Sequence, residues 1–361
     1  MSPAERSDSA DGASTPTGTG AGTGTGAEPL TTAQIAEHAG VSVATVSKVV
    51  NGRSDVAAGT RALVEEIIRR HGYRRQKRAA RPAAVLELVF RQVRDAYAIE
   101  IINGVQLVAR EHRLAVVLSE LQGRHTPSYG WVEDVLYRRP TGVIEVFSGL
   151  TDTQSGQLRS RGIPFVLVDP GGEPAHASPS VGASNWNGGL SATRHLLQLG
   201  HRRIAVITGP ERALASRARV DGYRTAMDTA GVPVDPDLVR VGDFRAEEGH
   251  ARARELLRLP DPPTAVFVCN DAQALGVYRA AAEAGLRIPE DLSVVGFDDL
   301  PAARWTVPPL TTVRQPLTEM AATAATMVVT MAQGQPLAQN RVELATELVI
   351  RDSTAPPRTA P

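Results

Sequence analysis

Two patterns of hydrophobic and polar positions divide the chain. Up to about residue 71 the apolar positions recur at helical spacing in short segments, whereas from Val85 onward apolar runs of strand length alternate with longer amphipathic stretches. The strand-length runs are Val85–Phe90, Leu114–Glu120, Gly142–Phe147, Phe165–Asp169, Arg203–Gly209, Leu238–Asp243, Ala265–Asn270 and Ser293–Asp298. Alternating strands and helices build parallel sheets with helices on both faces, and so many strands over about 270 residues predict two lobes.

Capping signals bound three helices in the first segment. Thr31 with a Gln three residues later is a capping box, and Gly40 supplies a left-handed C-cap. Ser42 is placed to cap a second helix over 43–50, and a third is expected over about 58–71. Two short helices joined by so tight a turn predict a helix-turn-helix, although an ordinary three-helix bundle has similar spacing.

Charge is distributed unevenly, although the net charge of the whole chain is zero. Residues 30–82 contain ten basic and four acidic side chains, so this segment is +6 and the remainder is −6. A basic segment joined to an acidic remainder is typical of a protein in which one domain binds the phosphate groups of nucleic acid. The charge therefore favours the DNA-reading interpretation of the helix-turn-helix over the plain bundle.

Composition disfavours several classes of protein. No apolar run approaches the roughly 20 residues that cross a bilayer, and the Ser/Thr/Gly/Pro-rich stretch 1–29, expected to be a disordered tail, lacks the pattern of an export signal. The single Cys269 leaves no disulfide, and His195 and His201 lack the spaced partners of a zinc site. We expect a cytoplasmic, nucleoid-associated protein without a membrane span, a metal or a cofactor.

Residues 31–52, TTAQIAEHAGVSVATVSKVVNG, continued by Thr60-Arg61 and Gly72-Tyr73, resemble the headpiece of the lactose-repressor (LacI/GalR) family. The resemblance continues to about residue 353 through LGHRRIA at 199–205, DGY at 221–223, VGFDD at 295–299 and PLTTV at 309–313. It implies a sequence-specific DNA-binding transcription regulator, with a repressor favoured, whose operator affinity is controlled by a small ligand between two lobes.

The resemblance also implies which headpiece residues contact DNA. Val43, Ala44, Ser47 and Lys48 take the major-groove reading positions, with Thr45 nearer the backbone. Since Val43 and Ala44 offer only apolar contact, Lys48 is expected to make the polar base contact, to guanine. The other expected DNA contacts are Thr31, Ser42, Asn51, Tyr73, Arg78 and Arg81.

Two positions depart from the family pattern. Ala57 stands where the third helix normally has a capping Ser, which costs about 1 kcal/mol unless Asp55 substitutes. Pro82 stands where the family's hinge helix has the Leu that wedges into the minor groove. A Leu wedge is therefore not expected, and Arg78 and Arg81 remain as candidates to enter a narrow minor groove.

Candidate ligand-binding residues lie at the ends of predicted strands, where ligands bind in such folds. By the resemblance Arg219, Asn270 and Asp298 match effector-binding positions. Asp169, Phe244 and Gln315 fall on further pocket positions, and Tyr97 is placed to stack on a sugar ring, whereas Asp271 is expected to be the N-cap of the following helix. A sugar, such as a pentose or a plant-polysaccharide fragment, is the favoured effector, and a purine or nucleoside is the alternative.

The expected organisation is an α-helical helix-turn-helix headpiece plus an α/β two-lobed periplasmic-binding-protein-like effector domain with two doubly wound parallel sheets. The segments are a tail at 1–29, the DNA-binding domain at 30–74, a hinge or linker at 75–84, the effector-binding and dimerisation domain at 85–353, and a flexible tail at 354–361. One lobe is expected from about 85–183 and 317–345, and the other from about 184–316 and 346–353.

We expect a homodimer on a near-palindromic operator, because paired reading helices need paired half-sites. No leucine heptad follows the large domain, which favours a dimer over a tetramer. An enzyme with a doubly wound fold is disfavoured because no glycine-rich phosphate loop follows the first strand and no nucleophile elbow is present. A sugar-binding transport protein is disfavoured by the basic headpiece and the missing export pattern.

Overall fold

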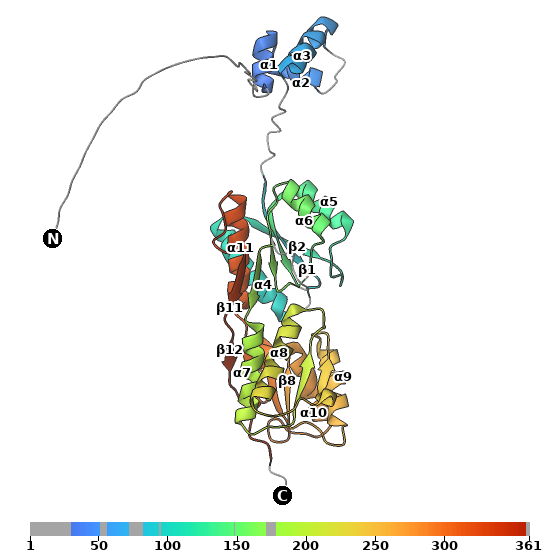
Figure 1. Cartoon of the computed structure of the whole chain (residues 1–361), viewed down its shortest axis with the longest axis vertical. Coiled ribbons are helices and arrows are strands. Elements are labelled where there is room, and N and C mark those ends of the chain that lie inside the picture. Colours follow the sequence, from blue (N-terminus) through green and yellow to red (C-terminus); the bar gives the residue numbers. More distant parts are fainter. Residues whose placement is uncertain are drawn as a thin grey trace, which may run out of the picture. The chain divides into compact units, whose positions relative to one another are not determined.

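The computed structural model describes residues 30–50, 56–71, 82–93, 95–147, 149–170 and 178–358 (Figure 1). The chain divides into two compact units, 1–81 and 82–361. The predicted tail at 1–29 and most of the predicted hinge, 75–81, lie outside the described residues. Within the described ranges no helix is long and apolar enough to cross a membrane.

The smaller unit packs three helices around one core. They are α1 (Thr32–Ala39), α2 (Val43–Val50) and α3 (Ala58–His71). The capping box at Thr31 forms as predicted, and Gly40 ends α1 in the left-handed region at φ 62°. The buried core consists of Ile35, Ala36, Ala39, Val46, Val49 and Val64. From α2, Val46 and Val49 are buried in this core and Val50 packs against it, so the exposed positions of that helix lie on its other face.

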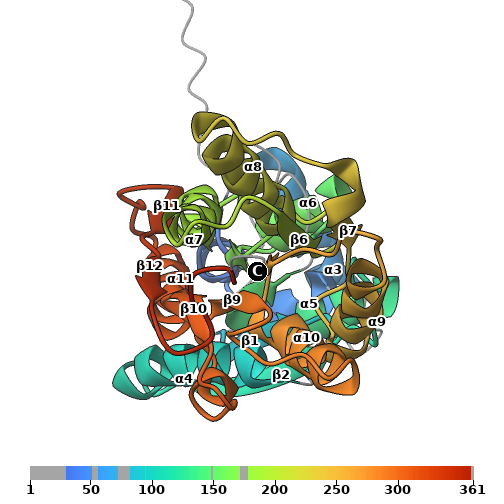
Figure 2. The same cartoon turned by 90° about the horizontal axis from the view of Figure 1, so that it is seen from below.

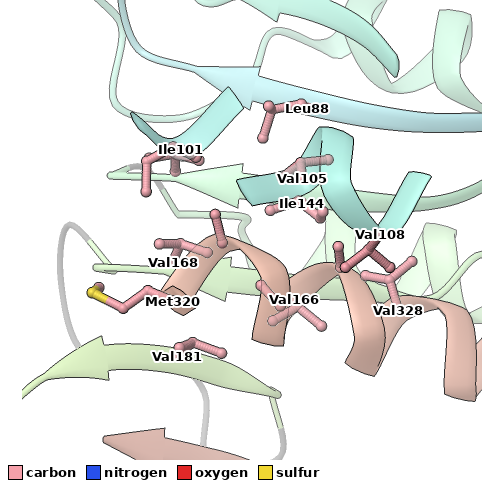
Figure 3. Close-up of a cluster of buried hydrophobic side chains, with 14 of the residues drawn as sticks. Leu88, Ile101, Val105, Val108, Ile144, Val166, Val168, Val181, Met320 and Val328 are labelled. Carbon is pink, nitrogen blue, oxygen red and sulfur yellow. The ribbon is translucent and has the colours of Figure 1, made fainter. Parts of the chain in front are cut away.

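The larger unit contains two six-stranded sheets. The first sheet is parallel throughout, in the order β11-β5-β4-β3-β1-β2. Its strands are β1 (Ala83–Phe90), β2 (Ala115–Glu120), β3 (Pro140–Val146), β4 (Phe165–Val168), β5 (Ser180–Ala183) and β11 (Arg341–Leu344). Helices α4 (Ala96–Glu111) and α11 (Leu317–Ala332) pack on one face through the apolar cluster of Figure 3, and α5 (Tyr129–Arg138) and α6 (Asp152–Ser160) pack on the other.

The second sheet has the order β12-β10-β9-β8-β6-β7, with only β12 antiparallel. Its strands are β6 (Ile204–Thr208), β7 (Val239–Val241), β8 (Ala265–Val268), β9 (Ser293–Asp298), β10 (Thr311–Arg314) and β12 (Glu347–Val349). Helices α7 (Asn185–Gln198) and α8 (Leu214–Thr229) cover one face, α9 (Ala246–Leu257) and α10 (Asp271–Glu283) cover the other, and short 3-10 turns occupy Pro236–Leu238 and Pro301–Arg304. The chain passes between the lobes after β5, β10 and β11.

Four described strands were not predicted from apolar runs: β5, β10, β11 and β12. They are short, and their sequences SVGA, TTVR, RVEL and ELV mix small, hydroxyl and charged residues. Their partners in the sheet, rather than their own hydrophobicity, make them strands. The predicted hinge boundary at residue 84 is also wrong, because β1 already begins at Ala83.

Residues 354–358 are not the free tail that the sequence predicted. The Thr354 hydroxyl lies 2.9 Å from His195 Nε2, and the carbonyl oxygen of Ala355 lies 2.9 Å from His201 Nε2. Arg358 Nη1 forms an ion pair with Asp291 at 2.6 Å. These partners lie 67 or more positions upstream in the sequence, so no local pattern could show that they tie this segment to the second lobe.

Helices α7 and α8 lie side by side on the second sheet, and glycines permit their close approach (Figure 2). A Cβ atom at Gly189 would lie 2.1 Å from the carbonyl oxygen of Arg219, and one at Gly222 would lie 2.2 Å from that of Trp186. Since those neighbours are backbone atoms, they cannot rotate away. The crossing therefore requires glycine at both positions.

We predict that Gly222→Ala destabilises the larger unit by about 1–3 kcal/mol, because the added methyl group forces the two helices apart. The thermal unfolding midpoint of the full chain should fall by several degrees. Gly156→Ala on α6 is the matched control, since a Cβ atom at Gly156 would have nothing within 4 Å; it should leave the midpoint unchanged or raise it. Equal midpoints for the two variants would contradict the close-crossing explanation.

Candidate functional site

A cavity of about 310 Å³ lies between the two lobes of the larger unit. It is lined from the first lobe by Phe90, Arg91, Gln92, Asp95, Tyr97, Ala98, Phe147 and Asp169, and from the second by Ala215, Arg219, Asp243, Phe244, Arg245, Asn270, Asp298, Leu300 and Gln315. The structure thus brings together all seven residues predicted to contact ligand. They meet because the carboxyl ends of both parallel sheets face the same space.

Several lining residues have a left-handed backbone, which places their side chains at the cleft. The φ angles are 46° at Asp169, 71° at Phe244 and 115° at Asp298. Non-glycine residues seldom adopt such angles. Each strained residue costs roughly 1–3 kcal/mol, and the conformation persists only where the surrounding structure imposes it. Their concentration where the chain leaves a strand is typical of binding sites.

Asp169 and Tyr97 form one polar pair on the first lobe. The Tyr97 hydroxyl donates a hydrogen bond of 2.7 Å to Asp169 Oδ2. Burial raises the pKa of Asp169, although the Tyr97 bond and the charge of Arg219 act in the opposite direction. The hydroxyl group of Tyr97 is therefore held by Asp169, and Tyr97 lines the cavity. That its ring stacks on a sugar stays a prediction.

Arg219 is the buried cation of the site, with 3% of its surface exposed. Its Nε donates to Asn185 Oδ1 at 2.8 Å, its Nη1 donates to the carbonyl oxygen of Cys269, and its guanidinium carbon lies 3.7 Å from the centre of the Phe297 ring. These contacts fix its orientation. Asn185 was not predicted, because it begins α7 directly after β5, a strand that the apolar pattern did not show.

Asp298 and Gln315 form the second polar pair. Gln315 Nε2 donates to Asp298 Oδ1 at 2.6 Å, and Arg219 Nη1 lies 3.8 Å from the same oxygen. Burial raises the pKa of Asp298 to about 7, against the lowering effects of Arg219 and Gln315. Gln315 Oε1 is buried and has no hydrogen-bond partner within the described part of the chain. A buried acceptor of this kind is typical of a position that a bound polar group completes.

Asn270, rather than Asp271, is the N-cap of α10. Asn270 has extended backbone angles, its Oδ1 accepts from the amide of Gln273 at 3.0 Å, and its Nδ2 donates to the carbonyl oxygen of Phe244 at 3.0 Å. The prediction for Asp271 was wrong by one residue. Its buried carboxylate accepts from the amide of Leu300 at 2.8 Å and from Thr312 Oγ1 at 2.6 Å, and it does not line the cavity.

Phe244 lines the cavity and also packs against other aromatic and cationic groups. Its ring lies edge-on to Phe147, with 5.6 Å between centroids, and Arg219 lies 5.9 Å from its centre. Phe147 belongs to the first lobe and Phe244 to the second, so this contact crosses the cleft. Phe244 is partly buried and also packs against the hydrophobic core of the second lobe.

The start of α2 presents the predicted DNA-reading side chains outward. Ser42, Val43, Ala44, Ser47 and Lys48 are exposed. The Ser42 hydroxyl accepts from the amide of Thr45 at 3.1 Å and lies 2.9 Å from the Thr45 hydroxyl, so these two residues form the helix cap. The structure therefore places the residues of α2 expected to read DNA on the face opposite the core.

Part of the predicted DNA-contacting set falls outside the structural description. Thr31 lies at the N-cap of α1, where its side chain caps that helix. Asn51, Tyr73, Arg78 and Arg81 lie outside the described residues and stay predictions.

Comparison with known proteins gives matches at both ends of the chain. Residues 31–76 match the family described as bacterial regulatory proteins, lacI family, and residues 193–354 match the periplasmic binding protein-like domain. The HTH-type transcriptional repressor CytR of Escherichia coli strain K12 is 31% identical over 324 residues, which covers 89% of this chain and 95% of the relative. The chain belongs to the LacI family.

Solved structures of LacI-family proteins have the same fold. The complex of the transcriptional regulator CelR with cellobiose is 33% identical, has a TM-score of 0.68, and covers 90% of this chain and 99% of its own. The lac repressor dimer bound to operator and the anti-inducer ONPF is 29% identical, has a TM-score of 0.66, and covers 91% of this chain and 100% of its own. The predicted resemblance and fold class are confirmed.

Family membership decides between the function classes left open by the sequence. This LacI-family chain is a DNA-binding transcription regulator with a ligand-binding effector domain, and its relatives are regulators rather than enzymes. The enzyme hypothesis is therefore dropped. Within the described ranges, no group of three or more His, Cys, Asp or Glu residues is placed to hold a metal ion.

We predict that Asp298→Asn alters how stability depends on pH. Because burial raises the pKa of Asp298 from 3.8 to about 7, its ionised form destabilises the fold at higher pH, and this destabilisation is relieved as pH falls from about 7 toward 3.8. The unfolding midpoint of the wild type should therefore rise by several degrees relative to that of the variant as pH falls from 8 to 5.

Thermal unfolding of the full chain across this pH range provides the measurement. Asp221→Asn, an exposed position on α8, is the control and should follow the wild-type profile. Parallel profiles for wild type and Asp298→Asn would show that Asp298 ionises normally in the folded protein.

Proposed function

We propose that this regulator is a homodimeric repressor of a near-palindromic operator, and that a sugar bound between the lobes controls its affinity for that operator. The observation that carries the sugar assignment is the buried, unpaired Oε1 of Gln315, a residue that lines the cavity together with Asp169 and Asp298. Several adjacent acceptors suit the hydroxyl groups of a sugar, each of which can donate a hydrogen bond.

Aromatic and cationic groups complete a sugar-binding arrangement. Tyr97 and Phe244 line the cavity with aromatic rings from opposite lobes, and Arg219 offers a guanidinium group 3.8 Å from the carboxylate of Asp298. The cellobiose bound by CelR supports a sugar by similarity. A purine or nucleoside is the alternative ligand. A free purine base has fewer hydrogen-bond donors than a sugar, whereas a nucleoside would add the hydroxyl groups of its ribose.

The operator-binding half of the proposal rests on the exposed face of α2. Val43, Ala44, Ser47 and Lys48 read the major groove, Thr45 lies nearer the backbone, and Arg78 and Arg81 enter the minor groove. The lac repressor dimer on its operator supports two copies on paired half-sites by similarity. The protein acts in the cytoplasm, at the nucleoid. Ligand binding changes operator affinity by favouring one arrangement of the lobes over another.

We predict that Lys48→Ala weakens operator binding by about 1–3 kcal/mol and relaxes the base preference at one position in each half-site. Binding to operator and to unrelated duplex should be measured at one salt concentration. Arg70→Ala, which removes an exposed cation from α3, is the control and should affect both duplexes equally. If Lys48→Ala also lowered both affinities equally, Lys48 would contact phosphate rather than a base.

We predict that Arg219→Ala abolishes the ligand response while operator affinity is retained, because Arg219 lies in the cleft and not in the headpiece. Operator binding by the full chain is first screened against neutral sugars and nucleosides, and the variants are then tested with each responding compound. Gln315→Met, in which the new side chain is similar in size to the old one, should also lose the response. This second variant keeps the prediction testable if Arg219→Ala fails to fold. Arg224→Ala, exposed on the same helix, should respond normally. Loss of operator affinity with a surviving response would contradict the pocket assignment.

A further inference from the structure

A second cavity lies beside the first in the cleft between the lobes. Its volume is about 310 Å³, the same as that of the first cavity. Residues of β5 and β11 line it from the first lobe, and residues near the starts of α7 and α8 line it from the second. Asp169 and Ala215 line both cavities. The two spaces therefore adjoin each other, which is the condition for one elongated ligand to occupy both.

The carboxylate of Asp169 links the two cavities. Its Oδ2 accepts the hydrogen bond from Tyr97, which lines the first cavity and not the second. Its Oδ1 lies toward Gly182, which lines the second cavity and not the first, since a Cβ atom at Gly182 would be 3.8 Å from that oxygen. Among the described residues, only Tyr97 donates a hydrogen bond to this carboxylate. Oδ1 is thus an available acceptor beside the second cavity.

The other charged groups of the second cavity come from the edge strand of the first sheet. Arg341 and Glu343 alternate on β11 with Val342, which packs against the apolar cluster of α4 and α11. Both charged side chains therefore point away from that cluster, and both line the cavity. Of the described residues that line it, only these two and Asp169 are ionisable. One cation and two carboxylates give no excess positive charge to attract an anion, but they offer donors and acceptors to hydroxyl groups.

Trp186 supplies an aromatic surface to the second cavity. It is the second residue of α7, it lines the cavity, and 41% of its surface is exposed. Leu214 and Ala218 of α8 extend the apolar side of the same space. A ligand ring placed against the indole would remove apolar surface from water while its hydroxyl groups reach the charged side chains. The second cavity thus combines an apolar face with polar groups, as a sugar ring requires.

We infer that the cleft binds a disaccharide, or the end of a longer oligosaccharide, with one ring in the first cavity and the next ring against Trp186 in the second. This inference rests on the proposed function and specifies the size of its ligand. Asp169 lies where the two rings join. Arg341 and Glu343 belong to the first lobe, and Trp186 and Ala218 to the second, so the second ring contacts both lobes. Its contacts therefore add to the preference of the ligand for one arrangement of the lobes.

Matched sugars test the size of the ligand. A panel of neutral monosaccharides and their disaccharides, including glucose with cellobiose and maltose and xylose with xylobiose, is measured by equilibrium binding to the full chain. At least one disaccharide should bind about tenfold or more tightly than its own monosaccharide, because the second ring covers Trp186. A monosaccharide that binds at least as tightly as every disaccharide of the panel would overturn the inference.

Two variants test the second cavity itself. Trp186→Ala, which leaves a good helix former in α7, should weaken the best disaccharide by about tenfold or more and change the affinity for its monosaccharide by less than about twofold. Ala218→Leu, which extends a side chain into the cavity, should have the same effect and keeps the test decisive if Trp186→Ala fails to fold. Tyr137→Ala removes an exposed aromatic side chain that lines neither cavity, and this control should bind both sugars as the wild type does. Equal losses for the two sugars, or no loss in either variant, would overturn the inference.

Tryptophan fluorescence reports the contact directly. Binding of the disaccharide should shift the emission of the wild-type chain to shorter wavelength, because the indole of Trp186 is withdrawn from water. The shift should be lost in Trp186→Ala and kept in Tyr137→Ala. A shift of equal size in Trp186→Ala would show that the second ring does not cover this side chain.

Operator binding separates this inference from the proposed function. A monosaccharide that changes operator affinity, with no disaccharide that binds more tightly, would overturn the second subsite and leave the sugar-controlled repressor intact. If no neutral sugar of either size bound, the sugar assignment would fall and this inference with it. Failure of the wild-type chain to bind any palindromic duplex would instead defeat the proposed repressor, whatever the affinities for sugars.

Discussion

The ligand cleft depends on one buried cation, Arg219. A charge removed from water is costly unless fixed partners replace its hydration. Here the partners come from α7, from the carbonyl after β8, and from the ring of Phe297 on β9, with Asp298 3.8 Å away. Arg219 and Asn185 can meet only because α7 and α8 cross at glycines, where any side chain would strike backbone. The close helix crossing and the polar site are therefore one structural requirement.

The direction of the parallel strands explains why the cleft lies where the lobes meet. Parallel strands direct their carboxyl ends to one edge, and the chain leaves several of them through left-handed residues such as Asp169 and Asp298. Those residues carry polar groups into a space that neither lobe could enclose alone. Tyr97 and Asp169 from one lobe thus stand opposite Gln315 and Asp298 from the other. A ligand that contacts both sets has different contacts in different lobe arrangements, and this is the physical condition for control of a separate DNA-binding unit.

The headpiece obeys a simpler constraint. Three short helices cannot each be stable alone, so α1, α2 and α3 depend on their shared core of small and branched side chains. Because α2 packs on that core through Val46, Val49 and Val50, it exposes Ser47 and Lys48 on its other face. The arrangement separates the residues that stabilise the unit from those that read DNA.

The sequence alone was sufficient for features whose cause is local or periodic. The capping box at Thr31, the left-handed Gly40, the eight apolar strands, the uneven charge and the family's ligand-binding positions were all visible along the chain, because each depends on residues a few positions apart or on a motif of fixed spacing. Tertiary structure alone decided the polar strands β5, β10, β11 and β12, the pairing of Arg219 with Asn185, and the attachment of residues 354–358. These features join side chains 34 or more positions apart, or strands that form only because a neighbour offers hydrogen bonds, and such contacts leave no pattern in the sequence.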